Sequence, residues 1–198
     1  MKQEERKRQT VRNLLDATKE LVREQGCETI KMKDIMERSQ LSKGAIFHYV
    51  KTKDEIFAMV LQEAVAETHA RFEAEVEERG KTFDGPMSRI AESFPALEDG
   101  KNVTNQILMY LLGKEQEPAV AEVLQAFYEQ TFRYSREWIV TGQQAGVIHD
   151  SVDANRMAEL LVLISLGQRL RSSIPGIAPG LFRADDFTSL IQSMLKRD

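Results

Sequence analysis

Residues 29–57 read TIKMKDIMERSQLSKGAIFHYVKTKDEIF, and this stretch decides the fold of the chain. It predicts two short helices joined by a tight turn, followed by the start of a third helix. Ile35 and Met36 would face inward from the first helix, and the apolar Leu41 would fill the angle at the turn. Ser42 is a good N-cap for the second helix, because its hydroxyl can accept a backbone N–H from the first turn. The stretch is therefore interpreted as a helix-turn-helix.

The second of these helices opens with the slim residues Lys43, Gly44 and Ala45. A recognition helix contacts base edges with its N-terminal residues, so that end must come close to the duplex. Ile46 and Val50 lie four apart and would face the core. Three further side chains remain free for the groove or the DNA backbone, namely Phe47, His48 and Tyr49. We therefore expect double-stranded DNA to be the partner of this region.

The next helix starts with a clear signal. Thr52 followed three residues later by Glu55 is a capping box, which satisfies two backbone donors at a helix start. Lys53 lies in the first turn, and a helix N-terminus with a lysine makes a natural phosphate site. Because Asp54 and Glu55 weaken that site, the phosphate role is assigned to Lys53.

This pattern resembles the DNA-binding domain of TetR-type transcriptional repressors, over roughly residues 8 to 60. In that family a serine, a lysine, a glycine, a small residue and two aromatics around a histidine open the recognition helix, and a lysine starts the fourth helix. Three positions depart from the pattern: Lys31 and Ala45 replace hydroxyl residues, and Gln40 replaces a glycine in the turn. The resemblance implies an operator-binding set made of Lys31, Lys33, Ser42, Lys43, Gly44, Ala45, Phe47, His48, Tyr49 and Lys53.

Composition and charge fit this interpretation. The first 55 residues hold 13 Lys and Arg against 10 Asp and Glu, whereas the whole chain has a net charge of −4. An acidic protein with a basic leading quarter is expected to present one surface to phosphates, although ordinary scatter of charge would also give this modest excess. No apolar run approaches the roughly 18 residues of a membrane span, and the start lacks the apolar segment of a signal peptide. We expect a cytoplasmic protein without a membrane partner.

Cysteine and cofactor signals are sparse. The single Cys27 excludes an intrachain disulfide, and it is read as a small apolar residue, with a redox-sensing thiol as the alternative. No phosphate-binding glycine motif and no Cys/His set at metal spacing is present. We therefore expect no catalytic residue, no metal and no cofactor. An all-helical enzyme and a helical interaction module without DNA binding are the alternative readings.

The rest of the chain favours helices, because apolar residues recur three and four apart without strand alternation. We expect an all-α fold of about nine helices. An N-terminal three-helix DNA-binding domain would cover residues 1–52, and a larger helical domain for effector binding and dimerisation would cover residues 53–198. Helices are expected from Val11 to near Gly26, Lys53 to about Gly80, Asp84 to near Gly100, Thr104 to Gly113, Pro118 to about Ala145, around Leu160–Leu166, and through Phe187 to Leu195.

The helix after Pro118 is rich in rings. Five of the 14 aromatic residues fall between residues 127 and 138. At 100° per residue, Phe127, Tyr134 and Trp138 lie within about 40° of one another. These rings either fill a core or line a cavity for a small apolar or amphipathic molecule. The resemblance favours the cavity, because TetR-type proteins carry an effector pocket in their larger domain.

Two C-terminal segments indicate self-association. Apolar residues cover nearly all sides of the helix at Leu160–Leu166, Gly167 would allow close helix approach, and the last helix carries an apolar stripe. These faces could belong to an intramolecular core or to a dimer interface. TetR-type proteins pair these two helices with their copies, and two-fold symmetry suits a palindromic DNA site. We expect a homodimer whose interface contains Leu163, Leu166, Gly167, Phe187, Leu190, Ile191 and Met194.

Overall fold

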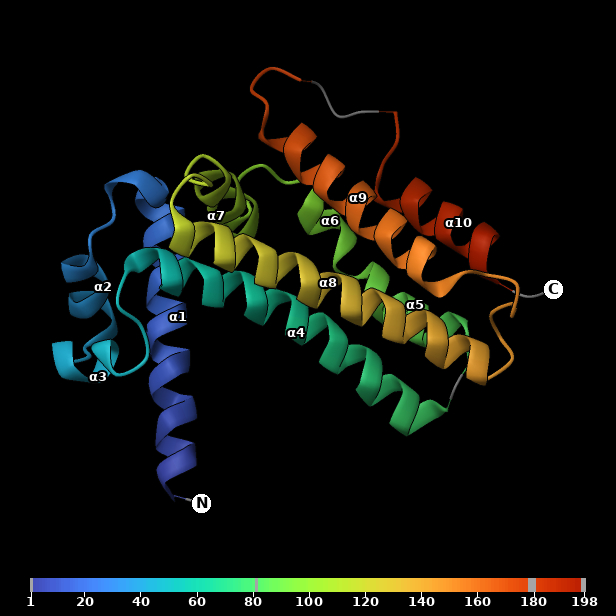
Figure 1. The fold of residues 1–198 in the computed structure, drawn as a ribbon, viewed down its shortest axis with the longest axis horizontal. Coiled ribbons are helices and arrows are strands. Elements are labelled where there is room, and N and C mark those ends of the chain that lie inside the picture. The colour runs from blue at the N-terminus through green and yellow to red at the C-terminus, as the bar shows by residue number, and fades with distance from the viewer. Residues whose placement is uncertain (1, 81, 178–180, 197–198) are drawn as a thin grey trace. The chain divides into compact units, whose positions relative to one another are not determined.

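The computed structural model describes residues 2–80, 82–177 and 181–196. Ten helices are found in these residues (Figure 1). An isolated antiparallel bridge joins Ile148 and Lys196. The prediction of an all-helical fold is confirmed. The helices are α1 (Lys2–Thr29), α2 (Met32–Ser39), α3 (Lys43–Phe47), α4 (Lys53–Arg79), α5 (Asp84–Ala91), α6 (Phe94–Leu97), α7 (Val103–Leu112), α8 (Pro118–Gln144), α9 (Ala154–Ser173) and α10 (Ala184–Leu195).

The chain packs into two compact units. Unit 1 is made of Met1–Glu63 and Lys101–Phe127, and unit 2 is made of Ala64–Gly100 and Tyr128–Asp198. The long helices α4 and α8 therefore contribute to both units. These units are defined by packing, whereas the expected boundary between residues 52 and 53 separates DNA binding from effector binding and dimerisation. That functional boundary stays a prediction.

Short-range contacts shape the helix-turn-helix of unit 1. The Asp34 carboxylate accepts the backbone N–H of Lys31 at 2.8 Å, so α2 is capped although Lys31 brings no hydroxyl. Gln40 ends α2 in the left-handed region, with φ 55°. Arg38 ties α2 to α1 through Glu24 at 2.6 Å and Glu20 at 3.2 Å. Each departure from the family pattern in α2 is thus accommodated by a local conformation or contact.

The core of unit 1 is formed by α1, α2, α3, the first part of α4, and α7. α7 packs directly on α1. The largest fully buried apolar side chains in this unit come from all five helices and from Ile30 between α1 and α2: Leu14, Ile30, Ile35, Ile46, Ile56, Phe57, Leu61, Ile107, Leu108 and Leu111. Because Ile35 and Ile46 both lie in this core, α2 and α3 are held as one rigid pair.

The core of unit 2 gathers residues from six helices. Its buried members include Phe72, Phe94, Ile139, Ala158 and Phe187. The short α6 packs against both α9 and α10. The expected single helix from Asp84 to near Gly100 is wrong, since the structure has α5 and α6 there, separated by residues 92 and 93. Pro95 explains the break, because proline lacks the N–H that would continue the helix.

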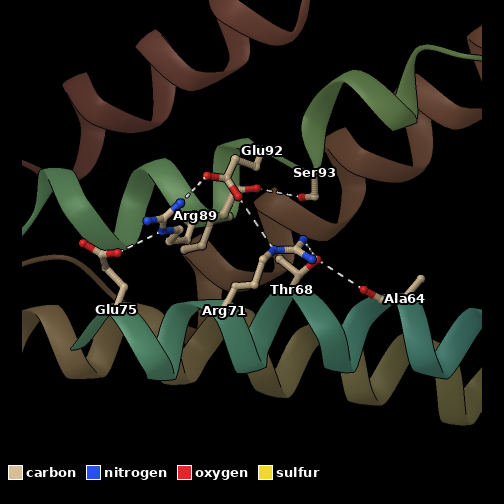
Figure 2. A network of polar contacts seen from close by, with 8 residues as sticks. Ala64, Thr68, Arg71, Glu75, Arg89, Glu92 and Ser93 are labelled. Carbon is tan, nitrogen blue, oxygen red and sulfur yellow. Dashed lines mark hydrogen bonds and ion pairs between the residues drawn. The ribbon is translucent and has the colours of Figure 1, made fainter. Parts of the chain in front are cut away.

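A polar network joins α4 and α5 within unit 2 (Figure 2). Glu75 is only 5% exposed and accepts from Arg89 Nε at 2.9 Å. Arg89 also donates to Glu92 at 2.7 Å, and Arg71 lies 3.8 Å from Glu92. Hydrogen bonding to Glu75 raises the pKa of Arg89. The charge of the buried Glu75 carboxylate is therefore balanced by Arg89.

Candidate DNA interface and effector site

α3 presents the predicted recognition surface. Ser42 accepts the Ala45 N–H at 3.2 Å and thereby caps this helix, as expected. Ile46 and Val50 are buried, whereas Lys43, Gly44 and His48 are exposed and Phe47 is 42% exposed. An exposed phenylalanine loses the free energy of burial, so a surface role accounts for it better than packing does. Ala45 and Tyr49 are half-buried at the margin.

The exposed edge combines charge and rings. The Lys43 ammonium lies 5.4 Å from the centre of the Phe47 ring, and His48 meets Tyr49 edge-to-face at 5.1 Å. A Cβ added at Gly44 would meet nothing within 4 Å, and its φ is not positive. Glycine costs a helix about 1 kcal/mol relative to alanine. Since packing inside the protein does not require this glycine, its small size suits a partner that approaches from outside.

Two lysines at the start of α2, a few residues before α3 in the chain, are also exposed. The Lys33 side chain is 80% exposed and lies 3.4 Å from Glu37. Lys31 precedes α2 and is likewise exposed. An exposed ion pair of this kind contributes little to stability, so Lys33 can exchange Glu37 for a phosphate at low cost.

Lys53 is placed differently. Its ammonium donates to three backbone carbonyls at the end of α1, those of Ile30 at 2.8 Å, Cys27 at 3.1 Å and Glu28 at 3.4 Å. The predicted cap at Thr52 is confirmed, since its hydroxyl accepts the Glu55 N–H at 3.2 Å. The Glu55 carboxylate accepts the N–H of Lys51 rather than that of Thr52. The phosphate role of Lys53 stays a prediction, but its ammonium already has acceptors within the protein.

Cys27 lies in the core of unit 1. Burial raises the pKa of its thiol to about 12. Reactive cysteines have a lowered pKa and are accessible. The structure therefore favours the apolar reading of Cys27 over a redox sensor.

Tyr134 and Trp138 meet His69 in unit 2. The Tyr134 ring stacks on the His69 ring with centroids 3.9 Å apart, and the Trp138 indole N–H donates to His69 Nδ1 at 3.1 Å. An indole N–H can only donate, so Nδ1 is an acceptor and the neutral ring carries its proton on Nε2. Nε2 lies 3.4 Å from Glu73 and 3.5 Å from Glu137. Two of the three predicted effector residues thus share one aromatic and polar cluster.

The third predicted residue lies elsewhere, since Phe127 is buried in unit 1. His69 was not among the predicted site residues. It could have been found, because Val65, His69, Phe72 and Val76 recur four and three apart on α4 and mark one face of the helix. We name the set His69, Phe72, Tyr134 and Trp138 the aromatic cluster.

The predicted interface residues divide into two sets. Leu163, Leu190 and Met194 are exposed, with Leu163 at 55%. Leu170, one turn beyond the exposed Gly167, extends this apolar face. Phe187 and Ile191 instead lie in the core of unit 2, at 1% and 3% exposure, and Phe187 packs on Phe94. The open apolar face of α9 and α10 is formed by Leu163, Leu166, Gly167, Leu170, Leu190 and Met194.

The described residues offer neither a membrane helix nor a metal site. None of their helices combines the length and apolar character needed to cross a bilayer. Within the same ranges, no group of three or more His, Cys, Asp or Glu side chains is arranged to hold a metal ion.

Comparisons with known proteins agree with this geometry. Residues 14–60 match the family model described as bacterial regulatory proteins, tetR family. Among solved structures, GusR of Salmonella enterica is 21% identical, with 94% of this chain and 95% of that chain covered and a TM-score of 0.59. A complex of SmeT with triclosan is 17% identical, with 96% and 92% covered and a TM-score of 0.66. No curated protein sequence gives a significant match.

A third structure extends the comparison. A putative transcriptional regulator from Saccharomonospora viridis, solved with choline, is 17% identical, with 94% of this chain and 98% of that chain covered and a TM-score of 0.63. At these identities the likeness establishes the fold. The helix-turn-helix and its exposed recognition edge define the class as a DNA-binding transcriptional regulator rather than an enzyme. The match over residues 14–60 identifies this segment as a DNA-binding domain of the TetR type.

Proposed function

We propose that the protein is a homodimeric repressor that binds a palindromic operator and is released by a small effector. The observation that carries the DNA-binding surface is the exposed edge of α3, where Lys43, Gly44, Phe47 and His48 face outward over a buried Ile46. Lys31, Lys33, Ser42, Ala45 and Tyr49 complete the proposed contact set. Side chains at the start of α3 would read bases, and the surrounding residues would hold phosphates.

The experiment is a selection from a random pool of DNA duplexes. The enriched duplex should contain two inverted half-sites spaced by about one helical turn, roughly 34 Å, or a multiple of it. Lys43→Ala should weaken binding to this duplex and lower the slope of log affinity against log salt by about 1 if Lys43 reaches a phosphate, or change site choice if it reaches a base. Failure of the wild-type protein to enrich any sequence would contradict the proposal.

The homodimer is supported by the open apolar face of α9 and α10. Leu163, Leu166 and Leu170 on α9 and Leu190 and Met194 on α10 would bury this face against the same face of a second copy. Such a self-complementary interface follows from two-fold symmetry. It also matches the symmetry of a palindromic operator, because each copy would present one α3 to one half-site.

The effector is proposed to bind at the aromatic cluster. Its half-buried rings Tyr134 and Trp138, with the polar His69 between them and the buried Phe72 beside them, suit a small apolar or amphipathic molecule. Phe127, in unit 1, is retained as a candidate residue on the same helix. The similar proteins SmeT and the S. viridis regulator were solved with triclosan and with choline, which makes these two compounds the first ligands to test.

Release requires only a difference in affinity between two states. A ligand that binds the DNA-incompetent state about a hundredfold better shifts the equilibrium by roughly 2.7 kcal/mol. Since α4 is one continuous helix shared by both units, a change in its tilt would alter the separation of the two α3 helices. Trp138 is the only tryptophan, so its fluorescence reports ligand entry directly.

The matched test uses His69→Leu, in the aromatic cluster, and Phe127→Leu, in unit 1. A ligand that binds at the aromatic cluster should lose affinity in His69→Leu and keep it in Phe127→Leu, measured by calorimetry. The opposite result would move the effector site to the surroundings of Phe127.

A further inference from the structure

The first turn of α4 holds the end of α1 in unit 1. α1 contains a break at Gly26, where φ is 73° and ψ is 171°, and its last carbonyls would otherwise lack partners. Lys53 donates to the carbonyls of Cys27, Glu28 and Ile30 at 3.4 Å or less. A cation at a helix C-terminus also interacts favourably with the helix dipole. Lys53 therefore fixes the peptide that immediately precedes α2.

Tyr110 of α7 supports Lys53 from another direction. The Lys53 ammonium lies 5.0 Å from the centre of the Tyr110 ring, and the Lys114 ammonium lies 5.3 Å from the same centre. The Tyr110 ring also meets Phe57 edge-to-face at 5.4 Å. Cation–π contacts of this kind stabilise the ammonium group, most strongly where water is excluded.

An ion pair closes the link. Lys114, just after α7, pairs with Asp54, whose side chain is only 13% exposed. The second oxygen of that carboxylate, Oδ1, is buried and has no hydrogen-bond partner in the described residues. A carboxylate in this position depends on Lys114, because removing one partner of a buried pair leaves an uncompensated charge. Two adjacent residues at the start of α4 are thus both held from the α7 side.

We propose that Lys53 serves DNA binding as a positioning residue rather than as a phosphate ligand, with Tyr110 and Lys114 fixing its place. Through this link, α7 sets the position of the α1–α2 junction and hence of α3. The inference rests on the DNA-binding function proposed above. It assigns Lys53 a role that differs from the one implied by the family resemblance.

The test compares Lys53→Met, Tyr110→Leu and Lys114→Met on the duplex selected by the wild-type protein. Each variant should raise the Kd about tenfold and leave the slope of log affinity against log salt unchanged, because no phosphate contact is lost. The double variant Lys53→Met with Tyr110→Leu should bind little worse than either single variant, since both changes break one link. Binding is measured at a temperature where circular dichroism shows full helicity.

Two controls separate the link from charge and from general destabilisation. Tyr110→Phe keeps the ring over Lys53 but removes the hydroxyl that interacts with Asp54 and Lys114, so its affinity should lie between those of the wild type and Tyr110→Leu. Lys51→Met removes an exposed positive charge two residues before Lys53. In this background the double variant of Lys53 and Tyr110 should still bind little worse than either single variant. A slope that falls by about 1 in Lys53→Met would assign Lys53 to a phosphate, and unchanged affinity in Tyr110→Leu would remove α7 from the link. Wild-type failure to select a duplex would instead refute the proposed function.

Discussion

The surroundings of α3 and the interior of unit 2 use polar groups in opposite ways. Around α2 and α3, capping bonds join residues three or four apart, as in Lys31 with Asp34 and Ala45 with Ser42. In unit 2 the main polar contacts join residues 14 and 69 apart, as in Glu75 with Arg89 and His69 with Trp138. The first region keeps its outward side chains available for a partner, whereas the second commits them to its own packing.

This contrast corresponds to two different functions, DNA recognition and signal transmission. A surface that reads DNA needs a preset backbone and free side chains, and local caps provide the backbone. A domain that transmits an effector signal needs helices that are tied to one another. The predictions below test each side of this contrast, beginning with the largest effect.

Leu163→Glu should have the largest effect, because it places a charge on the open face of α9. The dimer should dissociate, and affinity for the selected duplex should fall more than a hundredfold, since each copy alone makes half of the contacts. Sedimentation and operator binding measure the two effects. Leu112→Glu, at an exposed leucine outside this face, is the control and should change neither. A Leu163→Glu variant that still sediments as a dimer would place the interface elsewhere.

Arg89→Met should be the most destabilising single change in the network of Figure 2. Among the described residues it leaves the buried Glu75 with Arg79, at 3.6 Å, as its remaining ion-pair partner. We expect a loss of about 2–3 kcal/mol in the free energy of unfolding, measured with urea. Arg79→Met is the matched control, because Arg79 is 67% exposed and should contribute less than about 1 kcal/mol. Equal losses in the two variants would show that burial of Glu75 does not decide the effect.

His69→Leu should cost about 1 kcal/mol, the typical net contribution of one buried hydrogen bond. The Trp138 indole loses its acceptor, so its fluorescence spectrum should change. His149→Leu is the control: it removes an exposed contact with Ser151, so it should change stability by less than about 0.5 kcal/mol and leave the fluorescence unchanged. An unaltered Trp138 spectrum in His69→Leu would remove His69 from the aromatic cluster.

Gln40→Gly should give the smallest effect and the opposite sign. Gln40 adopts φ 55°, a conformation that costs L-residues about 1 kcal/mol and glycine almost nothing. Part of the gain is lost to the larger entropy of glycine in the unfolded chain, so stability should rise by about 0.5 kcal/mol. Gly26→Ala, at φ 73°, should lower stability by about 1 kcal/mol. A decrease in Gln40→Gly would show that its side chain makes a contact of its own.

The sequence predicted the helix-turn-helix well because its signals are local. Ser42, Thr52 and Ile46 act through residues at most four positions away, and those relations can be read directly from the chain. The C-terminal stripe was harder to interpret. Phe187 and Ile191 share the stripe with Leu190 and Met194, but only the packing of α10 on α6 decides which side faces inward.

The candidate sites show the same limit. Tyr134 and Trp138 were indicated by their spacing on one helix, whereas their partner His69 lies on another helix and could not be paired with them by periodicity. Lys53 was read from its position at a helix start, yet the direction of its ammonium depends on carbonyls more than 20 residues earlier. Long-range contacts of this kind are fixed by tertiary packing.

The central claim is that two copies of α3 read two half-sites, and repeating the duplex selection with α3 variants tests it most directly. Lys43→Ala and His48→Ala should each change the enriched bases at fixed positions, identically in both half-sites, while the spacing between half-sites stays the same. Enrichment of the unchanged wild-type sequence by both variants would contradict the assignment of α3 as the recognition helix, and a change confined to one half-site would contradict the symmetric dimer.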